Sequence, residues 1–506
     1  MTKRANILFL MTDQQRHDAL GCVNRVMRTP TLDALAARGV RFSQAVCNVP
    51  MCVPSRYSMM TGLYGFQLGV KHNTQMIVRD ADLPVPVLAQ RLADAGYQTA
   101  GVGKTHWYIG SRIMPGVPVA GSRRGFEVRA IQYVREPNND EVGSLYMGED
   151  EPDSLARVAA QAQKAGPGGE SVIGYIGETS NIPPERHREG WLTRQALRFL
   201  DRERDPGRPF FLYLSLDYPH VGLHVPPRFE DLYDLDDFAD SPPPDPIPGG
   251  HVHGHRFEQI WPQMTPEQRR RSRLRYAALC SYVDACFGQV IEKLRDVGEL
   301  DNTFILFASD HGDMLGDRGR VSKYCLYEGS VRVPLIMAGP GVDQSGVVDD
   351  RPVELVDVVP TVLETAGLDV PEALPGFSLL SDIRREGSCA EMHGRGYEEY
   401  QRAPAVMIRT PEWKLILYLP GRLSDSWPPV GGWRGELYSL TDDPLELHNR
   451  YSDAAHAAVR ERLTAQALMH VMGALGRYPY APARPRVRVT GPETKPDRSL
   501  WDVSAT

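Results

Sequence analysis

The apolar and polar positions of the first 370 or so residues predict an α/β protein. Apolar runs over 7–11 and up to Val102, and others that begin at Phe210, Thr303 and Val333, are typical of strands buried on both faces. Stretches with helical periodicity separate them, over 30–38, 83–95, 191–202 and 265–297. Buried strands that alternate with helices predict a mostly parallel central sheet flanked by helices, in one large α/β domain over 1–375.

The pattern changes after about Pro375. Residues 405–419 predict an antiparallel hairpin that turns at Thr410-Pro411, and residues 454–472 predict a helix. We therefore expect a smaller α+β domain over 376–476. Residues 477–506 form a tail rich in proline and charge. Its aromatic residues among prolines suggest that it packs across another subunit, which makes a homo-oligomer the expected assembly; a tail folded on its own subunit is the alternative.

Composition narrows the class of protein. The net charge of −7 argues against a general nucleic-acid binder, and no apolar run is long enough to cross a membrane. The N-terminal apolar run is too short for a secretion signal and predicts a buried first strand. Seven cysteines form an odd set without close CxxC pairs, which suits reduced thiols in the cytoplasm.

One insertion contains three histidines, His251, His253 and His255. They could bind a metal, but no cysteine or carboxylate spacing completes a site, so a proline-stiffened surface loop is the favoured interpretation.

Polar residues follow four of the predicted strands, where ligands bind in open parallel sheets. The first strand ends at Asp13-Gln14, the second at Lys104 and His106, the third at Asp217 and His220, and the fourth at Asp310-His311. A single such ending is often a helix cap. Four of them on one predicted edge indicate a shared site.

The chemistry of these residues is coherent. Asp13, Asp310 and the amide oxygen of Gln14 are hard donors suited to Ca²⁺, Mg²⁺ or Mn²⁺, and the nitrogen of His311 favours Mn²⁺ or Zn²⁺. The cations that accompany them are Arg56, Lys104 and Lys323. Concentrated positive charge beside a metal predicts an anionic substrate, either a sulfuryl or a phosphoryl ester.

Cys52 stands in "CVPSR", in what the sequence predicts to be a polar turn ahead of a helix, where neither a core thiol nor a disulfide is expected. Together with "MTGLYG", this stretch resembles the signature of the type I sulfatase family, within the alkaline phosphatase superfamily. Further blocks in family order are "MTDQQR", "GVGKTHW", "YPHVGLHVPP", "SDHGDMLGDRG", "SKYCLYEGSVRVPL" and "ELYSLTDDPLEL". They cover most of the chain from residue 6 to about 450.

The resemblance implies an alkaline phosphatase-like fold and a site with assigned roles. A formylglycine-generating enzyme would convert Cys52 to Cα-formylglycine, the nucleophile, which would bind one divalent cation together with Asp13, Gln14, Asp310 and His311. Ca²⁺ is the expected metal and Mn²⁺ the alternative. Arg56 would orient the modified residue, and Lys104 and Lys323 would bind ester oxygens. His106 would serve formylglycine turnover, His220 the leaving group, with His224 as its runner-up, and Asn73 would lie near the substrate oxygens.

Two departures keep alternatives open. Arylsulfatases often have an aspartate where Gln14 stands and an asparagine where His311 stands, and the present pair is more similar to choline sulfatases and phosphonate monoester hydrolases. Sulfate ester hydrolysis is the favoured function. Phosphonate monoester or phosphodiester hydrolysis at the same site is the first alternative, and a non-catalytic anion-binding protein with unmodified Cys52 is the second.

Overall fold

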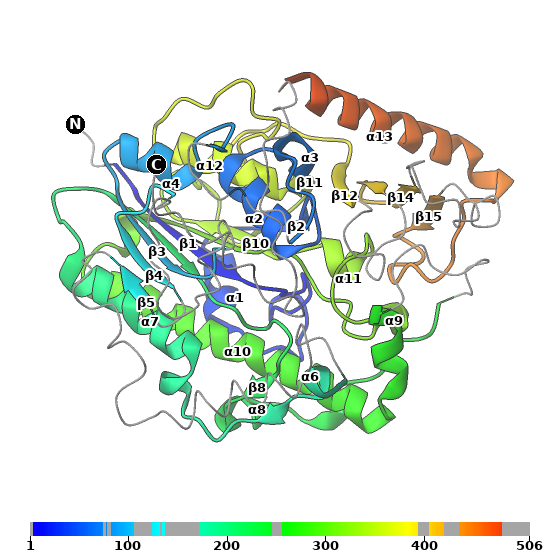
Figure 1. The fold of residues 1–506 in the computed structure, drawn as a ribbon, viewed down its shortest axis with the longest axis horizontal. Helices are drawn as coiled ribbons and strands as arrows, with labels where there is room; N and C mark the ends of the chain where they lie inside the picture. Colours follow the sequence, from blue (N-terminus) through cyan, green and yellow to red (C-terminus); the bar gives the residue numbers. More distant parts are fainter. Residues whose placement is uncertain are drawn as a thin grey trace, which may run out of the picture.

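The computed structural model describes residues 4–73, 77, 82–105, 124–131, 134–136, 172–244, 256–392, 404–418 and 435–477. In this part of the chain, nine strands form one sheet in the order β11-β2-β10-β9-β1-β7-β3-β4-β5 (Figure 1). The bounds of these strands are β1 Asn6–Thr12, β2 Val40–Val46, β3 Gln98–Gly103, β4 Val128–Ile131, β5 Val134–Glu136, β7 Phe210–Ser215, β9 Thr303–Ser309, β10 Leu335–Ala338 and β11 Val347–Glu354.

The middle of this sheet is parallel. Strands β9, β1, β7 and β3 lie side by side in one direction, and they are the four strands whose polar ends the sequence predicts to meet. Strand β10 runs antiparallel to both β9 and β2, and β5 runs antiparallel to β4. The predicted mostly parallel sheet is therefore confirmed, with a reversed strand towards each edge.

Helices cover both faces of the sheet because β1 is apolar on both faces. Phe9 belongs to the core on one face and Leu10 to the core on the other. The first face is covered by α2 Cys52–Thr61, α4 Leu88–Asp94 and α12 Val358–Thr365, and the second by α1 Pro30–Arg38, α7 Arg188–Arg198 and α10 Pro266–Asp296 (Figure 1). The shorter helices are α3 Gly65–Leu68, α6 Val172–Ile176, α8 Pro227–Glu230, α9 Arg256–Ile260 and α11 Glu328–Val331, and β6 Glu178–Thr179 pairs with β8 His224–Val225.

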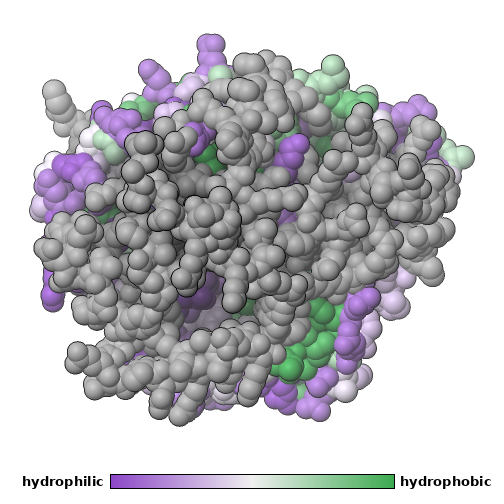
Figure 2. Space-filling model, viewed as in Figure 1, coloured by the Kyte–Doolittle hydropathy of each residue, from purple (hydrophilic) through white to green (hydrophobic). Residues whose placement is uncertain are grey.

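A second, antiparallel sheet joins β12 Ser388–Met392, β13 Ala405–Arg409, β14 Trp413–Tyr418 and β15 Gly435–Ser439. Its side chains alternate between two cores: Met407 packs into the core of the main sheet, and Ile408 packs under the helix α13 Ala457–Arg477. Figure 2 shows hydrophobic atoms at the upper right, over α13, where Leu468, Met469 and Met472 are exposed. The predicted hairpin is confirmed, and the domain boundary near residue 375 stays a prediction.

Several expected element boundaries are wrong. Helix α4 begins at Leu88 rather than residue 83, because Pro84 and Pro86 precede it and a proline disfavours helical backbone in the residue before it. Helix α7 begins at Arg188 rather than Trp191, and a π-helical turn over Phe199–Glu203 follows it. The sequence did not predict strands β2 and β11, because half-buried or exposed residues interrupt their apolar pattern.

Candidate active site

Cys52 is the first residue of helix α2, and the residue is only 3% exposed. The prediction that Cys52 lies in a turn ahead of a helix is therefore wrong. The prediction took Pro54 as the sign of a turn. A proline in the first turn of a helix costs no hydrogen bond, however, because the first amides of a helix have no partner within the helix. Two side-chain contacts fix this turn: the Val53 amide donates to Oδ1 of Asn73 at 3.0 Å, and the Ser55 hydroxyl donates to the carbonyl of Asp310 at 2.5 Å.

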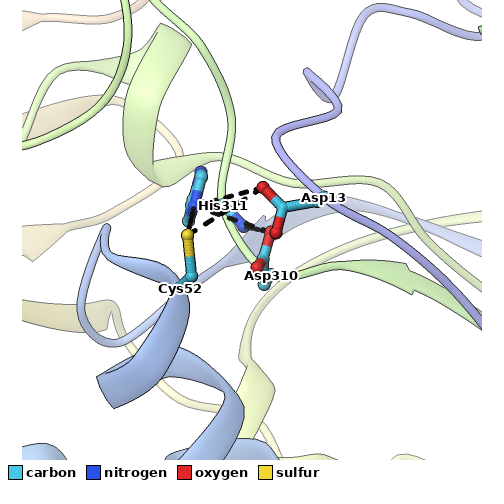
Figure 3. Close-up of side chains that lie close together, drawn as sticks. All are labelled: Asp13, Cys52, Asp310 and His311. Carbon is cyan, nitrogen blue, oxygen red and sulfur yellow. Dashed lines mark hydrogen bonds and ion pairs between the residues drawn. The ribbon is translucent and has the colours of Figure 1, made fainter. Parts of the chain in front are cut away.

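Four potential ligand atoms converge beside the start of α2 (Figure 3). They come from Asp13, Cys52, Asp310 and His311, and all lie within 4.8 Å of one another. Sγ of Cys52 is 3.2 Å from Nε2 of His311 and 3.9 Å from Oδ1 of Asp13. Nδ1 of His311 lies 3.0 Å from the carbonyl of Gly312, so a proton there leaves Nε2 free to act as a ligand.

Arg56 neutralises the outer side of this cluster. Its guanidinium is fully buried and binds Oδ2 of Asp310 at 2.7 Å and Oδ2 of Asp13 at 3.1 Å. The ammonium of Lys104, at the end of β3, binds the same Asp13 oxygen at 2.6 Å. Both cations therefore bind Oδ2 oxygens of the carboxylates, and Oδ1 of Asp13 is directed at Cys52 and His311.

Lys323 and His220 form the other side of the site. Nζ of Lys323 lies 2.9 Å from Nε2 of His220 and donates to the amide oxygen of Gln14 at 2.6 Å. Nε2 of His220 is 4.0 Å from Oδ1 of Asp13, so the pair faces the same cluster. Residues from six separate segments of the chain thus meet at the carboxyl edge of the parallel strands.

Comparison with known proteins assigns the family. The sulfatase family model matches residues 5–368, which is most of the chain. The chain belongs to the sulfatase family. It is an enzyme of the sulfuric ester hydrolase class. A second match, to the C-terminal part of N-sulphoglucosamine sulphohydrolase, covers residues 316–472.

Two relatives agree with this assignment, and a solved structure shares the fold. A choline-sulfatase of Rhizobium meliloti is 30% identical over 92% of this chain and 86% of its own length. An arylsulfatase of Clostridium perfringens is 27% identical over 88% of this chain and 90% of its own length. The fold is similar to that of a phosphonate monoester hydrolase from Silicibacter pomeroyi, with a TM-score of 0.71, 23% identity, and coverage of 93% of this chain and 96% of that one.

The donor set of this sulfatase fits a divalent cation. Asp13 and Asp310 offer carboxylates and His311 a ring nitrogen to the cluster, while the amide oxygen of Gln14, the other predicted ligand, accepts from Nζ of Lys323. Carboxylate oxygens and a ring nitrogen are donors that divalent cations accept. These residues would hold the metal that the family requires.

The charges and the burial of the sulfatase site shift the pKa values of Asp13, Cys52 and His220. Burial opposes the ionised form of Asp13, but Lys104, His220 and Arg56 outweigh it and hold the pKa of Asp13 well below its usual value. For Cys52, burial and Asp13 raise the pKa of the thiol, and Lys323, Lys104 and His311 together lower it below the ordinary value. Burial, followed by Lys323, holds the pKa of His220 well below its usual value. The positive charges of the site therefore favour the anionic forms of Asp13 and Cys52.

The structure separates some of the predicted residues from the others. Asn73 contacts the backbone of α2 and donates to the hydroxyl of Tyr324 at 3.2 Å. His224 pairs with Glu178 at 3.1 Å, whereas His220 contacts Lys323, so the geometry favours His220. His106 and the three histidines His251, His253 and His255 lie outside the described residues. No helix in the described ranges is both long and apolar enough to span a membrane.

The sequence did not reveal the groups that hold Arg56 and Gln14 in place. Nη1 of Arg56 also donates to Oγ of Ser215 at 2.9 Å and to the carbonyl of Lys104 at 2.7 Å. The carboxylate of Asp313 accepts a hydrogen bond from the amide nitrogen of Gln14. A signal was available for Asp313, because it stands two residues after His311 in the same polar block.

Proposed function

We propose that this sulfatase cleaves small anionic sulfate esters to an alcohol and sulfate, with Cys52 converted to formylglycine as the source of the nucleophile. The observation that carries the proposal is the position of the Cys52 side chain. It lies within 4.8 Å of three ligand groups and is flanked by Lys104 and Lys323, which suits a nucleophile that attacks an anionic group.

The metal proposed is Ca²⁺, with Mn²⁺ as the alternative, held by Asp13, Gln14, Asp310, His311 and the modified residue 52. When bound, the ion acidifies a hydroxyl of the hydrated aldehyde and withdraws charge from the transferring sulfuryl group. Arg56 compensates the two carboxylates from the side opposite the substrate.

Two hydroxyls of the hydrated aldehyde divide the reaction into two steps. One attacks sulfur, and the bond between sulfur and the alcohol oxygen breaks. The His220–Lys323 pair is placed to give the leaving alcohol its proton, since Nζ of Lys323 and Nε2 of His220 already share one hydrogen bond. The second hydroxyl then loses its proton to a base, the role we propose for His106. The carbon–oxygen bond to sulfate breaks, the aldehyde returns, and water hydrates it again.

Intact peptide mass across residue 52 tests this proposal. Conversion replaces the thiol with an aldehyde oxygen and makes the peptide lighter. We expect the lighter peptide in an active preparation, and turnover in proportion to its share. An active preparation with only unmodified Cys52 would contradict the mechanism, and an unmodified, inactive preparation that binds sulfate would favour an anion-binding protein.

Hydrolysis of phosphonate monoesters or phosphodiesters is the second candidate. The donor pair Gln14 and His311 favours it, because it is the pair that departs from the arylsulfatase pattern. Rates for an aryl sulfate, an aryl phosphonate monoester and a phosphodiester with the same leaving group separate the two. A higher kcat/KM for either phosphorus substrate would replace our first assignment.

Three further proposals concern partners and location. A formylglycine-generating enzyme is the proposed partner for Cys52, since "CVPSR" resembles the family sequence that such an enzyme modifies. A homo-oligomer is supported by the exposed Leu468, Met469 and Met472 on α13. The cytoplasm is supported by seven cysteines that are all unpaired thiols. The expected contact of the tail with another subunit lies outside the described residues, apart from Arg477.

A further inference from the structure

Asp313 is a buried carboxylate that no assigned role explains. It is 1% exposed and lies in the loop after β9, two residues beyond His311. Four groups contact its two oxygens, two from its own loop and two from distant parts of the chain. Charged residues are rarely buried this completely unless they are paired or fully hydrogen-bonded.

The two oxygens of Asp313 have different partners. Oδ1 accepts the amide of Leu315 at 2.7 Å and the amide of Ser322 at 2.8 Å. Ser322 precedes Lys323, and both Ser322 and Tyr324 have a left-handed backbone, with φ of 67°. Non-glycine residues rarely adopt this conformation, so Oδ1 helps to hold the strained loop that presents Lys323.

The other oxygen, Oδ2, faces Gln14, the proposed metal ligand. It accepts the side-chain nitrogen of Gln14 and, at 3.3 Å, the hydroxyl of Tyr175. The carboxylate oxygen is an acceptor, and the NH₂ group of Gln14 is turned towards it. The amide oxygen of Gln14 then points the other way, where it accepts from Nζ of Lys323 at 2.6 Å.

We infer that Asp313 is a positioning residue, which fixes the orientation of the Gln14 amide so that its oxygen faces the metal site and Lys323. Gln14 itself has a left-handed backbone, with φ of 69°, and its amide could rotate about its terminal bond without moving the chain. Only the partners of the amide decide which end faces the metal. The inference rests on the proposed metal chemistry of this site.

An isosteric substitution separates this role from simple loop support. In Asp313→Asn, the side-chain oxygen keeps the amides of Leu315 and Ser322, and an NH₂ group replaces Oδ2. Two NH₂ groups then face each other, or Gln14 turns over and directs nitrogen at the ammonium of Lys323. We expect Mn²⁺ to bind about 10–100-fold more weakly and turnover to fall, as for other residues that orient metal ligands.

A reciprocal exchange should restore the site. In the double variant Asp313→Asn with Gln14→Glu, the asparagine donates to the new carboxylate, which still presents an oxygen to Lys323 and to the metal. The net charge of the pair is unchanged. Gln14→Glu alone places two carboxylates against each other and should also bind Mn²⁺ poorly. The double variant should therefore bind more tightly than either single variant, which is the sign of coupled residues.

The test is a titration of the full-length protein with Mn²⁺ alone, followed by electron paramagnetic resonance, with kcat and KM for an aryl sulfate measured in parallel. Asp317→Asn is the matched control: Asp317 lies in the same loop but pairs with Arg16 at 2.7 Å, so Mn²⁺ binding should not change. The inference is overturned if Asp313→Asn binds Mn²⁺ as the wild type does, or if the double variant is no better than the single ones.

A folding failure and an inactive wild type each leave the inference testable. If Asp313→Asn does not fold, Gln14→Glu compared with the double variant carries the test, and equal Mn²⁺ affinity overturns the inference. If the wild type binds Mn²⁺ but turns over no sulfate ester, the proposed function fails, and the pattern of Mn²⁺ affinities still decides the role of Asp313.

Discussion

Two buried charge clusters in this sulfatase differ in a way that separates a reactive site from a structural one. The first is the active site, and the second, here called the junction cluster, lies between the main sheet and the four-stranded sheet. The junction cluster consists of Glu328, Arg409, Lys414 and Glu446. Lys414 binds Glu328 at 2.7 Å and Glu446 at 2.8 Å, and Arg409 binds Glu328 at 2.8 Å. Each carboxylate therefore has a cation.

The active site has the same kinds of charge in a different arrangement. Arg56 and Lys104 bind Asp13 only through Oδ2, and Oδ1 faces Cys52 and His311. A cavity of about 270 Å³ adjoins the junction cluster, but Glu328 and Arg409, which line it, bind each other. What distinguishes the active site is thus that the two cations bind Oδ2 of Asp13 and Oδ1 is directed at Cys52 and His311, and not the presence of buried charge or of space.

The largest expected effect is the loss of the nucleophile. Cys52→Ala and Cys52→Ser should each lower kcat by about 10⁴-fold or more, because removal of a nucleophile leaves only binding and electrostatic stabilisation. The fold should remain, since the change removes or replaces one atom. Turnover and melting temperature of each purified variant provide the measurement. Retention of a sizeable fraction of wild-type activity by Cys52→Ala would contradict the formylglycine mechanism.

Asp310→Ala should abolish metal binding together with activity. The substitution removes a hard anionic ligand and also one of the two carboxylates that balance the buried Arg56. Metal analysis of the purified protein gives the occupancy, and Asp310→Asn is the control that keeps the shape of the side chain. Full occupancy in Asp310→Ala would show that Asp310 is not a ligand.

Lys414→Met should produce the opposite result, a loss of stability without a loss of chemistry. It leaves Glu446 buried without its cation, which costs about 3–5 kcal/mol for a broken buried ion pair. Urea unfolding measures this cost, and kcat per folded molecule should stay at the wild-type value. A fall in kcat in fully folded protein would mean that the junction cluster is coupled to the active site.

The smallest expected effect is a dependence of stability on pH. Burial lowers the pKa of His187 to about 4, and its ring contacts the carbonyl of Ile182 at 3.1 Å. Because the folded pKa lies below the unfolded value of 6.5, this histidine contributes stability above pH 6.5 that is lost as pH falls towards 4. A shift of this size corresponds to at most about 3 kcal/mol. His187→Gln should reduce the pH dependence of unfolding, measured by urea unfolding between pH 4 and pH 7.

The sequence predicted what depends on local patterns. The runs that became β1, β3, β7 and β9 are apolar because both faces of a central parallel strand are buried, and the polar residues after them mark one edge of the sheet. The edge strands β2 and β11 were missed because solvent-facing positions interrupt their apolar runs.

The roles of individual side chains in the site could not be predicted this way. Gln14 and Lys323 are 309 positions apart, and Gln14 and Asp313 are 299 apart, yet each pair is in contact. No spacing rule reveals such a contact. The placement of Cys52 inside α2 was missed for a local reason, since the proline two residues later favoured a turn.

The burial of Cys52 sets an order of events in time. A modifying enzyme must bring its own active site up to the Cys52 sulfur, but in the folded chain Cys52 is buried and its sulfur lies against His311. His311 is 259 positions further along the chain, so a nascent chain that has not reached it cannot close the pocket over Cys52. If residue 52 becomes formylglycine, the conversion belongs to the interval before the sheet assembles, and a folded molecule that has missed it must unfold locally to be converted.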